Sequence, residues 1–183
     1  MIFKNFFEDR DYFKFIVYGL MIFSVLLFLI LSRKAKVAIW VSIFIFVNMV
    51  MTSYKKIIRL RLEIELLTLG IVLCTVSFGV KAGLVVAILG GILSFFVGLD
   101  INPFIFPMFV GYVMMVFTSY LLDGMNITYI GIFTSLINNL FVFLIYHLLF
   151  GYEITKNLRY SLSNIIFNLI LFFNIAPLIY RLM

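Results

Sequence analysis

The chain has 183 residues, of which 65% are hydrophobic and only 12% are charged. This charged share is about half that of an ordinary globular domain. Apolar stretches of 18 or more residues recur along the whole sequence and leave no room for a separate soluble domain. They predict an all-α polytopic membrane protein. The formal charge of +6 comes from Lys and Arg residues dispersed between the apolar stretches, so no nucleic-acid-binding surface is expected.

The apolar stretches predict a transmembrane helix bundle with about seven spans. A hydrocarbon core of roughly 30 Å needs about 20 helical residues, and these segments meet that length: 12–32, 36–54, 62–80, 82–99, 101–122, 127–150 and 159–181. We expect one integral membrane domain over 1–183, made of an N-terminal helical hairpin (1–54) and a five-helix core (62–183). Six spans are the alternative, because only Lys81 and its flanks separate the third and fourth segments, which form either a tight hairpin or one interrupted element.

The basic residues divide unequally between the two sides of this bundle. The side that holds the N-terminus collects nine of them: Lys4, Arg10, Lys14, Lys55, Lys56, Arg59, Arg61, Lys156 and Arg159. The other side collects five: Arg33, Lys34, Lys36, Lys81 and Arg181. The positive-inside rule then predicts a multi-pass protein of the cell (plasma) membrane with a cytoplasmic N-terminus, and seven spans place the C-terminus outside.

The most polar stretch, KKIIRLRLEIELLTLG (residues 55–70), leads into the third segment. Arg59 and Glu63 are four residues apart and could pair on a helix surface, which predicts an amphipathic first turn or two at the headgroup level. Glu65 stands about one turn inside the segment, where a carboxylate is costly and often functional. A salt bridge to Arg61 is the plainer interpretation of Glu65.

Small residues recur in FGVKAGLVVAILGG (residues 78–91). Gly79, Gly83, Ala87 and Gly91 are spaced by four, so on one helix they form a groove that lets another backbone approach closely. A phosphate-binding loop would need a preceding strand and a Lys followed by Ser or Thr, and the stretch has neither. The pattern therefore predicts helix packing, either with a helix of this chain or with a partner subunit.

Amides are the unusual polar feature of the last two segments. At helical spacing they fall on shared faces: Gly131, Ser135 and Asn139 with Asn138 beside them, and then Ser161, Asn164 and Asn168. They could form hydrogen bonds between helices, worth about 0.6–2 kcal/mol each in lipid. They could also line a pocket for a small polar solute, and the candidate ligand-binding residues are then Glu65, Asn138, Asn139, Asn164 and Asn168.

The sequence shows no constellation typical of catalysis or metal binding. His147 has no Cys, second His or acid at ligand spacing, and no serine stands in a nucleophile-elbow setting. The single cysteine, Cys74, lies in an apolar run and is expected to be a buried apolar residue. We therefore expect no enzymatic activity, no metal and no cofactor.

The order of motifs from residue 62 onward resembles two related families. An E-x-E-leading span (EIELLTLGIVLC) is followed by a glycine-lined helix (FGVKAGLVVAILGGILSF), a Pro-broken helix (INPFIFPMFVGYV) and a last N-x-x-x-N helix ending in IAPLIYRL. This order is similar to that of the substrate-binding S components of energy-coupling-factor transporters and of the rod-shape-determining membrane protein MreD. One departure is the early span VAIWVSIFIFVNMVM, which lacks the small-residue face that S components present to their coupling subunit.

The resemblance implies two alternative functions. An S-component-like protein would be a helical bundle that binds a vitamin or metal-related solute and docks on a separate membrane subunit driven by ATPases. A MreD-like protein would bind no ligand and would act as a structural subunit of a cell-envelope assembly. Both imply the lipid bilayer and other membrane proteins as partners.

Overall fold

The computed structural model describes residues 32–58, 65–98 and 105–183. The chain divides into two compact units, residues 1–39 and 40–183. Of the first unit, the described residues form the start of helix α3 (Arg33–Ile58), where the Ser32 hydroxyl accepts the Ala35 N–H at 3.1 Å. This side-chain bond satisfies one of the backbone donors that a helix start leaves open.

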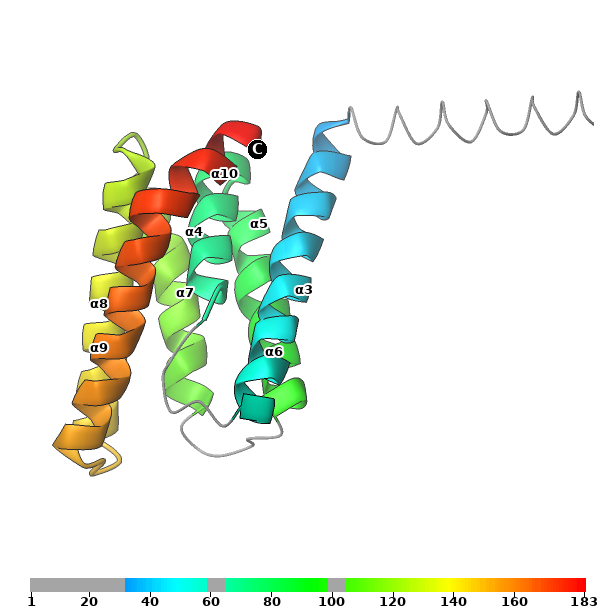
Figure 1. Ribbon diagram of the computed structural model, residues 1–183. Coiled ribbons are helices and arrows are strands. Elements are labelled where there is room, and N and C mark those ends of the chain that lie inside the picture. Colours follow the sequence, from blue (N-terminus) through cyan, green and yellow to red (C-terminus); the bar gives the residue numbers. More distant parts are fainter. Residues whose placement is uncertain (1–31, 59–64, 99–104) are drawn as a thin grey trace, which may run out of the picture. The chain divides into compact units, whose positions relative to one another are not determined.

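Every regular element in the described residues is helical, which confirms the all-α prediction (Figure 1). After α3 come α4 (Leu67–Phe78), α5 (Val80–Val85), the π-helical η1 (Val86–Gly90), α6 (Gly91–Gly98), α7 (Ile105–Leu121), α8 (Ile127–Leu148), α9 (Ile154–Ile170), the π-helical η2 (Leu171–Ile175) and α10 (Ala176–Leu182). α5, η1 and α6 form one continuous rod, and so do α9, η2 and α10. These helices coincide with six of the predicted segments, and the first, 12–32, lies outside the described residues.

Four helical stretches of the described chain are long and apolar enough to cross a membrane: Arg33–Ser53, Val80–Val97, Ile127–Leu148 and Ile154–Leu182. α4 and α7 are apolar but shorter. Of the six predicted segments that fall in the described residues, four therefore have a membrane-spanning length.

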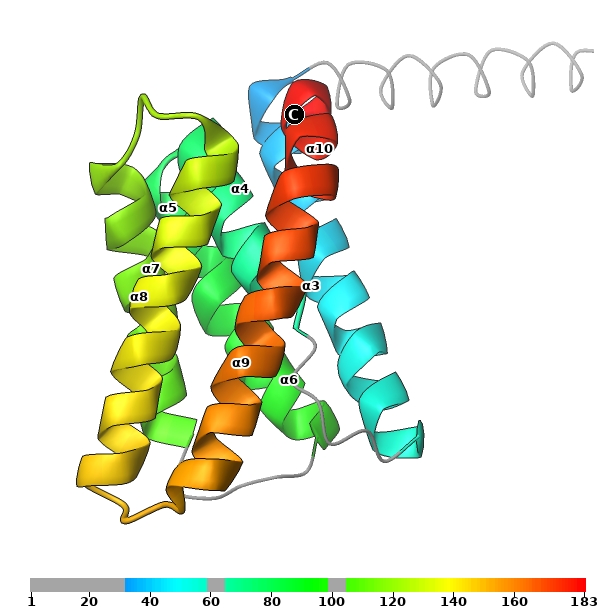
Figure 2. The same ribbon diagram turned by 60° about the vertical axis from the view of Figure 1, so that its left-hand side comes forward.

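Helix α4 is the buried centre of the second unit. Every residue from Leu67 to Thr75 is buried, because α4 packs against α5, η1, α7, α8 and α10 (Figures 1 and 2). Cys74 is fully buried within it, as predicted. At 1.5 Å per residue its 12 residues extend about 18 Å, little more than half of a hydrocarbon core. α4 is therefore an enclosed half-length helix.

A single residue, Gly79, turns the chain from α4 into α5. Its φ of 94° and ψ of 172° lie in a region that is essentially restricted to glycine. The two helices then pack against each other. Of the two arrangements left open by the sequence, the structure has the tight hairpin.

Replacing Gly79 with alanine should lower the free energy of unfolding by about 1–3 kcal/mol through backbone strain. A clash is not the cause, since nothing lies within 4 Å of where the Cβ would stand. Gly151→Asn is the matched control, because Gly151 has a φ of 61°, which asparagine tolerates. Unfolding in mild detergent, followed by circular dichroism, measures both variants. Equal stability of Gly79→Ala and the unsubstituted chain would contradict the strain argument.

Polarity in the second unit is the reverse of that in a soluble protein. Its buried residues include five amides: Asn48, Asn139, Asn157, Asn164 and Asn168. Its outer surface carries large apolar side chains that are 60% or more exposed, among them Phe46, Phe96, Phe106, Leu140, Phe173 and Leu178. Water disfavours this arrangement, whereas lipid favours apolar side chains outside and polar contacts between helices. The polarity therefore indicates a membrane protein.

The predicted small-residue groove is covered by helices of the same chain. A Cβ on Gly83 would lie 2.0 Å from Thr75 Oγ1 on α4, and one on Gly91 would lie 3.3 Å from the Tyr112 ring on α7. Ala87, between them, is fully buried. Gly79 does not belong to this face, because it forms the turn.

The π-helical segment η1 aligns the two ends of this groove. Gly83 and Gly91 are eight residues apart, which on a regular helix leaves them about 80° out of line. Both nevertheless contact α7, since Gly83 also lies against Val116. The wider turn of η1 between them reduces the angular offset.

Candidate functional site

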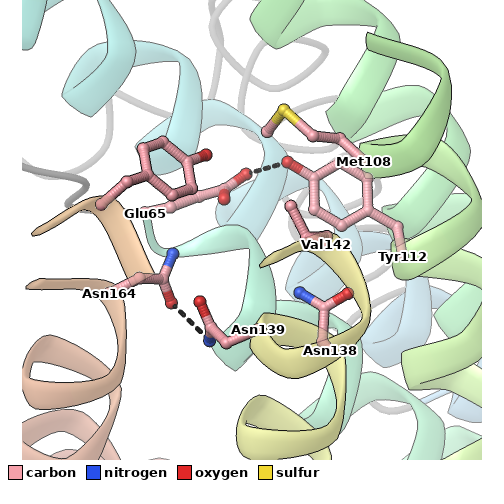
Figure 3. A pocket seen from close by; sticks show the side chains of 8 residues that line it. Glu65, Met108, Tyr112, Asn138, Asn139, Val142 and Asn164 are labelled. Carbon is pink, nitrogen blue, oxygen red and sulfur yellow. Dashed lines mark hydrogen bonds between the residues drawn. The ribbon is translucent and has the colours of Figure 1, made fainter. Parts of the chain in front are cut away.

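A polar cavity lies among four parts of the second unit. Figure 3 shows side chains that line it, and the full lining comprises Glu65, Met108, Tyr112, Asn138, Asn139, Val142, Tyr160 and Asn164. They come from the segment before α4, from α7, from α8 and from α9. The cavity encloses about 260 Å³ when its open mouth is included. The side chains leave space inside it for about one water molecule.

Glu65 lies inside the bundle, directly before α4. Its exposed fraction is 8%, and the Tyr112 hydroxyl of α7 donates a hydrogen bond to its Oε1 (Figure 3). Leu67 packs against Gly90, which is 11 residues from the Gly79 turn along the adjacent rod. Glu65 is therefore separated from the level of that turn by the whole length of α4, about 18 Å.

The prediction that Glu65 stands in the first turns of a helix is wrong. Glu65 and Leu66 are not helical, and α4 begins only at Leu67. No capping residue or turn residue stands directly before Leu67, so the sequence gave no sign of this later start. The partner proposed for Glu65, Arg61, lies outside the described residues, as does the predicted pair of Arg59 and Glu63.

Amide hydrogen bonds join α8 to α9 beside the cavity. Asn139 Nδ2 donates to Ser135 O at 2.8 Å and across the interface to Asn164 Oδ1 at 3.2 Å. Nearer the loop between the helices, Asn157 Nδ2 donates to Phe143 O at 2.9 Å. These contacts hold Asn139 and Asn164 in place as two walls of the cavity.

Four of the five candidate ligand-binding residues come together at the cavity. Glu65, Asn138, Asn139 and Asn164 line it, although they are up to 99 residues apart in the sequence (65 to 164). Asn168 does not line it and is buried one turn farther along α9, where its Nδ2 donates to Asn164 O at 3.0 Å. Asn168 thus supports the position of Asn164.

Four residues that line the cavity are not among the predicted candidates: Met108, Tyr112, Val142 and Tyr160. A signal existed on α9, because Tyr160 precedes Asn164 by four residues and so shares its face. For Tyr112 the sequence offered no comparable signal.

Several buried oxygen atoms in the described residues have no hydrogen-bond partner within the protein. Three of them lie on α9: Asn157 Oδ1, Ser161 Oγ and Asn168 Oδ1. Asn138 Oδ1 is a fourth, and it occupies the space left by the absent side chain of Gly111. Such atoms are rare in folded proteins and require an explanation.

The loop between α8 and α9 carries a solvated ion pair. Lys156 Nζ lies 2.7 Å from Glu153 Oε2, and the Thr155 hydroxyl donates to Glu153 Oε1 at 2.6 Å. These contacts, that with Lys156 first, hold the pKa of Glu153 below its ordinary value. Any stability they add is present above the unfolded-state pKa of Glu153 and is lost as the pH falls through the folded-state value. Both groups are exposed, so the effect is small.

No protein-family model matches the chain, and no match was found among curated proteins or among solved structures. The class of the protein therefore follows from its own features. It is an all-helical bundle with several helices apolar and long enough to cross a membrane, and its buried polar side chains include those around the Glu65 cavity.

Proposed function

We propose that this chain is a non-enzymatic, multi-pass protein of the cell membrane that binds a small polar solute at the Glu65 cavity, as the binding subunit of a transporter. The proposal follows the S-component-like expectation in its general form. The observation that carries it is a buried carboxylate grouped with three amides and two phenols.

The energetic cost of Glu65 supports a functional role. A charged side chain at the centre of a transmembrane helix costs about 2.5–3.5 kcal/mol on insertion scales, and Glu65, directly before α4, is likewise enclosed by the bundle. A hydrogen bond such as that from Tyr112 returns about 1.5–3 kcal/mol at most. Leucine would fill similar space without a charged group to bury, and the acid is therefore more readily understood as part of a polar site than as packing.

The proposed topology has seven spans, with residues 12–32 as the first and the N-terminus in the cytoplasm. In the second unit, Lys81 follows the Gly79 turn and Arg181 lies in the last turn of α10. Lys156 and Arg159 lie in the first two turns of α9, at the opposite end of the rod of α9, η2 and α10 (Figure 1). This separation supports the division of basic residues between two sides, and the proposed topology puts the loop between α8 and α9 in the cytoplasm.

Mass spectrometry of the protein purified in mild detergent tests the solute-binding proposal. We expect a stoichiometric polar small molecule with the unsubstituted chain and its loss in Glu65→Gln, which keeps an acceptor for Tyr112 but removes the charge. Asn174→Ala is the matched control, because Asn174 is an exposed amide bonded only to Ile170 O of its own helix. Retention of the molecule by Glu65→Gln would count against the site.

The MreD-like structural subunit is the second candidate. It is favoured by the small free space in the cavity and by the amides Asn139, Asn164 and Asn168, which hydrogen-bond to one another. In this case the protein should co-purify with a cell-envelope membrane protein and no ligand. Replacing Asn164 and Asn168 with leucine should then leave partner binding intact.

A further inference from the structure

We infer that the solute bound at the Glu65 cavity is a small molecule with a cis-amide edge: a lactam, a ureide or a primary carboxamide. The inference rests on the proposed function, because it names the class of solute that the same cavity takes. It is carried by one donor and one acceptor, which Asn164 and Asn139 leave open on the cavity side of their shared hydrogen bond.

Backbone carbonyls fix the orientation of two amides beside the cavity. Asn139 Nδ2 donates to Ser135 O at 2.8 Å, and Asn168 Nδ2 donates to Asn164 O at 3.0 Å. Since a carbonyl oxygen can only accept, the amide atom that faces it is the nitrogen in both cases. The Asn139 oxygen therefore lies on the other side of its amide group.

These two nitrogens fix the orientation of Asn164 in turn. Both donate to Asn164 Oδ1, that of Asn139 at 3.2 Å across the interface between α8 and α9, and that of Asn168 from one turn farther along α9. The opposite orientation would place the Asn164 amino group against two other donors. Figure 3 shows the result: Asn164 Nδ2 and Asn139 Oδ1 are both directed to the side of Glu65.

Asn164 Nδ2 and Asn139 Oδ1 have no hydrogen-bond partner among the described residues. Both are accessible from the cavity, in contrast to the enclosed oxygens of Asn157, Ser161 and Asn168. Because the donor and the acceptor belong to two side chains, a solute that meets both carries its own acceptor and donor on neighbouring atoms. An amide does so: its carbonyl accepts from Asn164, and its N–H donates to Asn139.

Other features of the cavity suit a small planar solute. Tyr112 and Tyr160 line it with aromatic rings, against which planar groups stack. With its open mouth the cavity encloses about 260 Å³, less than the roughly 300–1,000 Å³ typical of sites for drug-sized ligands. The inner space for about one water molecule receives the amide edge alone, and the rest of the solute lies toward the mouth.

NMR of the chain with isotope-labelled asparagine side chains, purified in mild detergent and dialysed free of any retained solute, tests the inference. The probes are δ-valerolactam and cyclohexanone, a ring of the same size that keeps the carbonyl but lacks the N–H. We expect the lactam to shift the Asn164 Nδ2 signal with a dissociation constant at least about tenfold lower than that of the ketone, which leaves Asn139 Oδ1 without a donor. The exposed amide of Asn174 is the internal control and should not distinguish the probes.

Asn164→Asp assigns the signal, because it removes Nδ2 and keeps an oxygen for Asn139 and Asn168. Equal responses to the two probes, or a response to neither, overturn the inference, and so does a retained solute without an amide edge. Mass spectrometry of the purified protein separates this failure from that of the proposed function. A retained solute that is lost in Glu65→Gln would leave the proposed function standing without the amide edge. No retained solute, together with no response to either probe, would remove both.

Discussion

Replacing Gly131 with alanine should lower the free energy of unfolding by about 3 kcal/mol, the upper part of the usual range for overpacking. A Cβ on Gly131 in α8 would lie 2.0 Å from Cδ1 of the Phe172 ring. Phe172 belongs to η2 and is fully buried, so its ring cannot move aside without displacing neighbours. Reversible unfolding in mixed detergent micelles measures the loss.

Two further variants make this prediction specific. Gly91→Ala is the control, because its Cβ would come no closer than 3.2 Å to Phe109. A small relaxation accommodates that contact, and its cost should be much lower. Adding Phe172→Leu to Gly131→Ala should recover part of the lost stability, since the smaller side chain frees the space. Equal costs for both glycines, or no recovery in the double variant, would show that the ring contact is not the cause.

Removing the hydrogen-bonded pair of Glu65 and Tyr112 together should cost less stability than removing Glu65 alone. Glu65→Leu alone takes away the acceptor of the Tyr112 hydroxyl and should cost about 1–3 kcal/mol. Adding Tyr112→Phe removes the hydroxyl that Glu65→Leu leaves without this acceptor, so part of the cost should be recovered. The same micelle unfolding experiment measures both variants.

Opposite effects on stability and binding are the result expected of a functional acid. The double variant should lose the bound solute while it keeps its fold. Tyr112→Phe alone is the matched control, because it retains the carboxylate and the ring. A double variant that is strongly destabilised would instead assign Glu65 and Tyr112 to structural support of α4 and α7.

Most of the helices could be predicted from sequence, because a long apolar run indicates a membrane-spanning helix. The buried polar face of α8 and that of α9 could also be predicted. Ser135 and Asn139 are buried on α8, and Asn164 and Asn168 are buried on α9, as their spacing of four residues indicates. Fixed helical geometry converts spacing into a shared face. These predictions needed no knowledge of the neighbouring helix.

Features set by distant contacts could not be predicted in this way. The half-length of α4 is invisible in the sequence, because no capping residue or turn residue stands directly before Leu67. The environment of Glu65 depends on Tyr112, 47 residues farther along the chain. The π-helical segments likewise follow from packing, because neither composition nor periodicity distinguishes Val86–Gly90 from the α-helix around it. Three of the five candidate ligand-binding residues nevertheless lie on the two predicted faces. Asn139 and Asn164 line the cavity, and Asn168 supports the position of Asn164.

Segment η1 makes the rod of α5, η1 and α6 sensitive to its residue count. A π-helical turn holds one residue more than an α-helical turn, so deleting one residue within Val86–Gly90 would let the rod close into a regular helix. Residues 83 and 91 would then be seven positions apart and only about 20° out of line, so the downstream half would keep both its length and its facing side. Gly91 would stay against Tyr112, and Ser94 would stay near Asn48, whose Nδ2 now donates to the Ser94 hydroxyl at 2.6 Å. A single insertion would instead turn the downstream half by about 100°, so this segment should tolerate the loss of one residue far better than the gain of one.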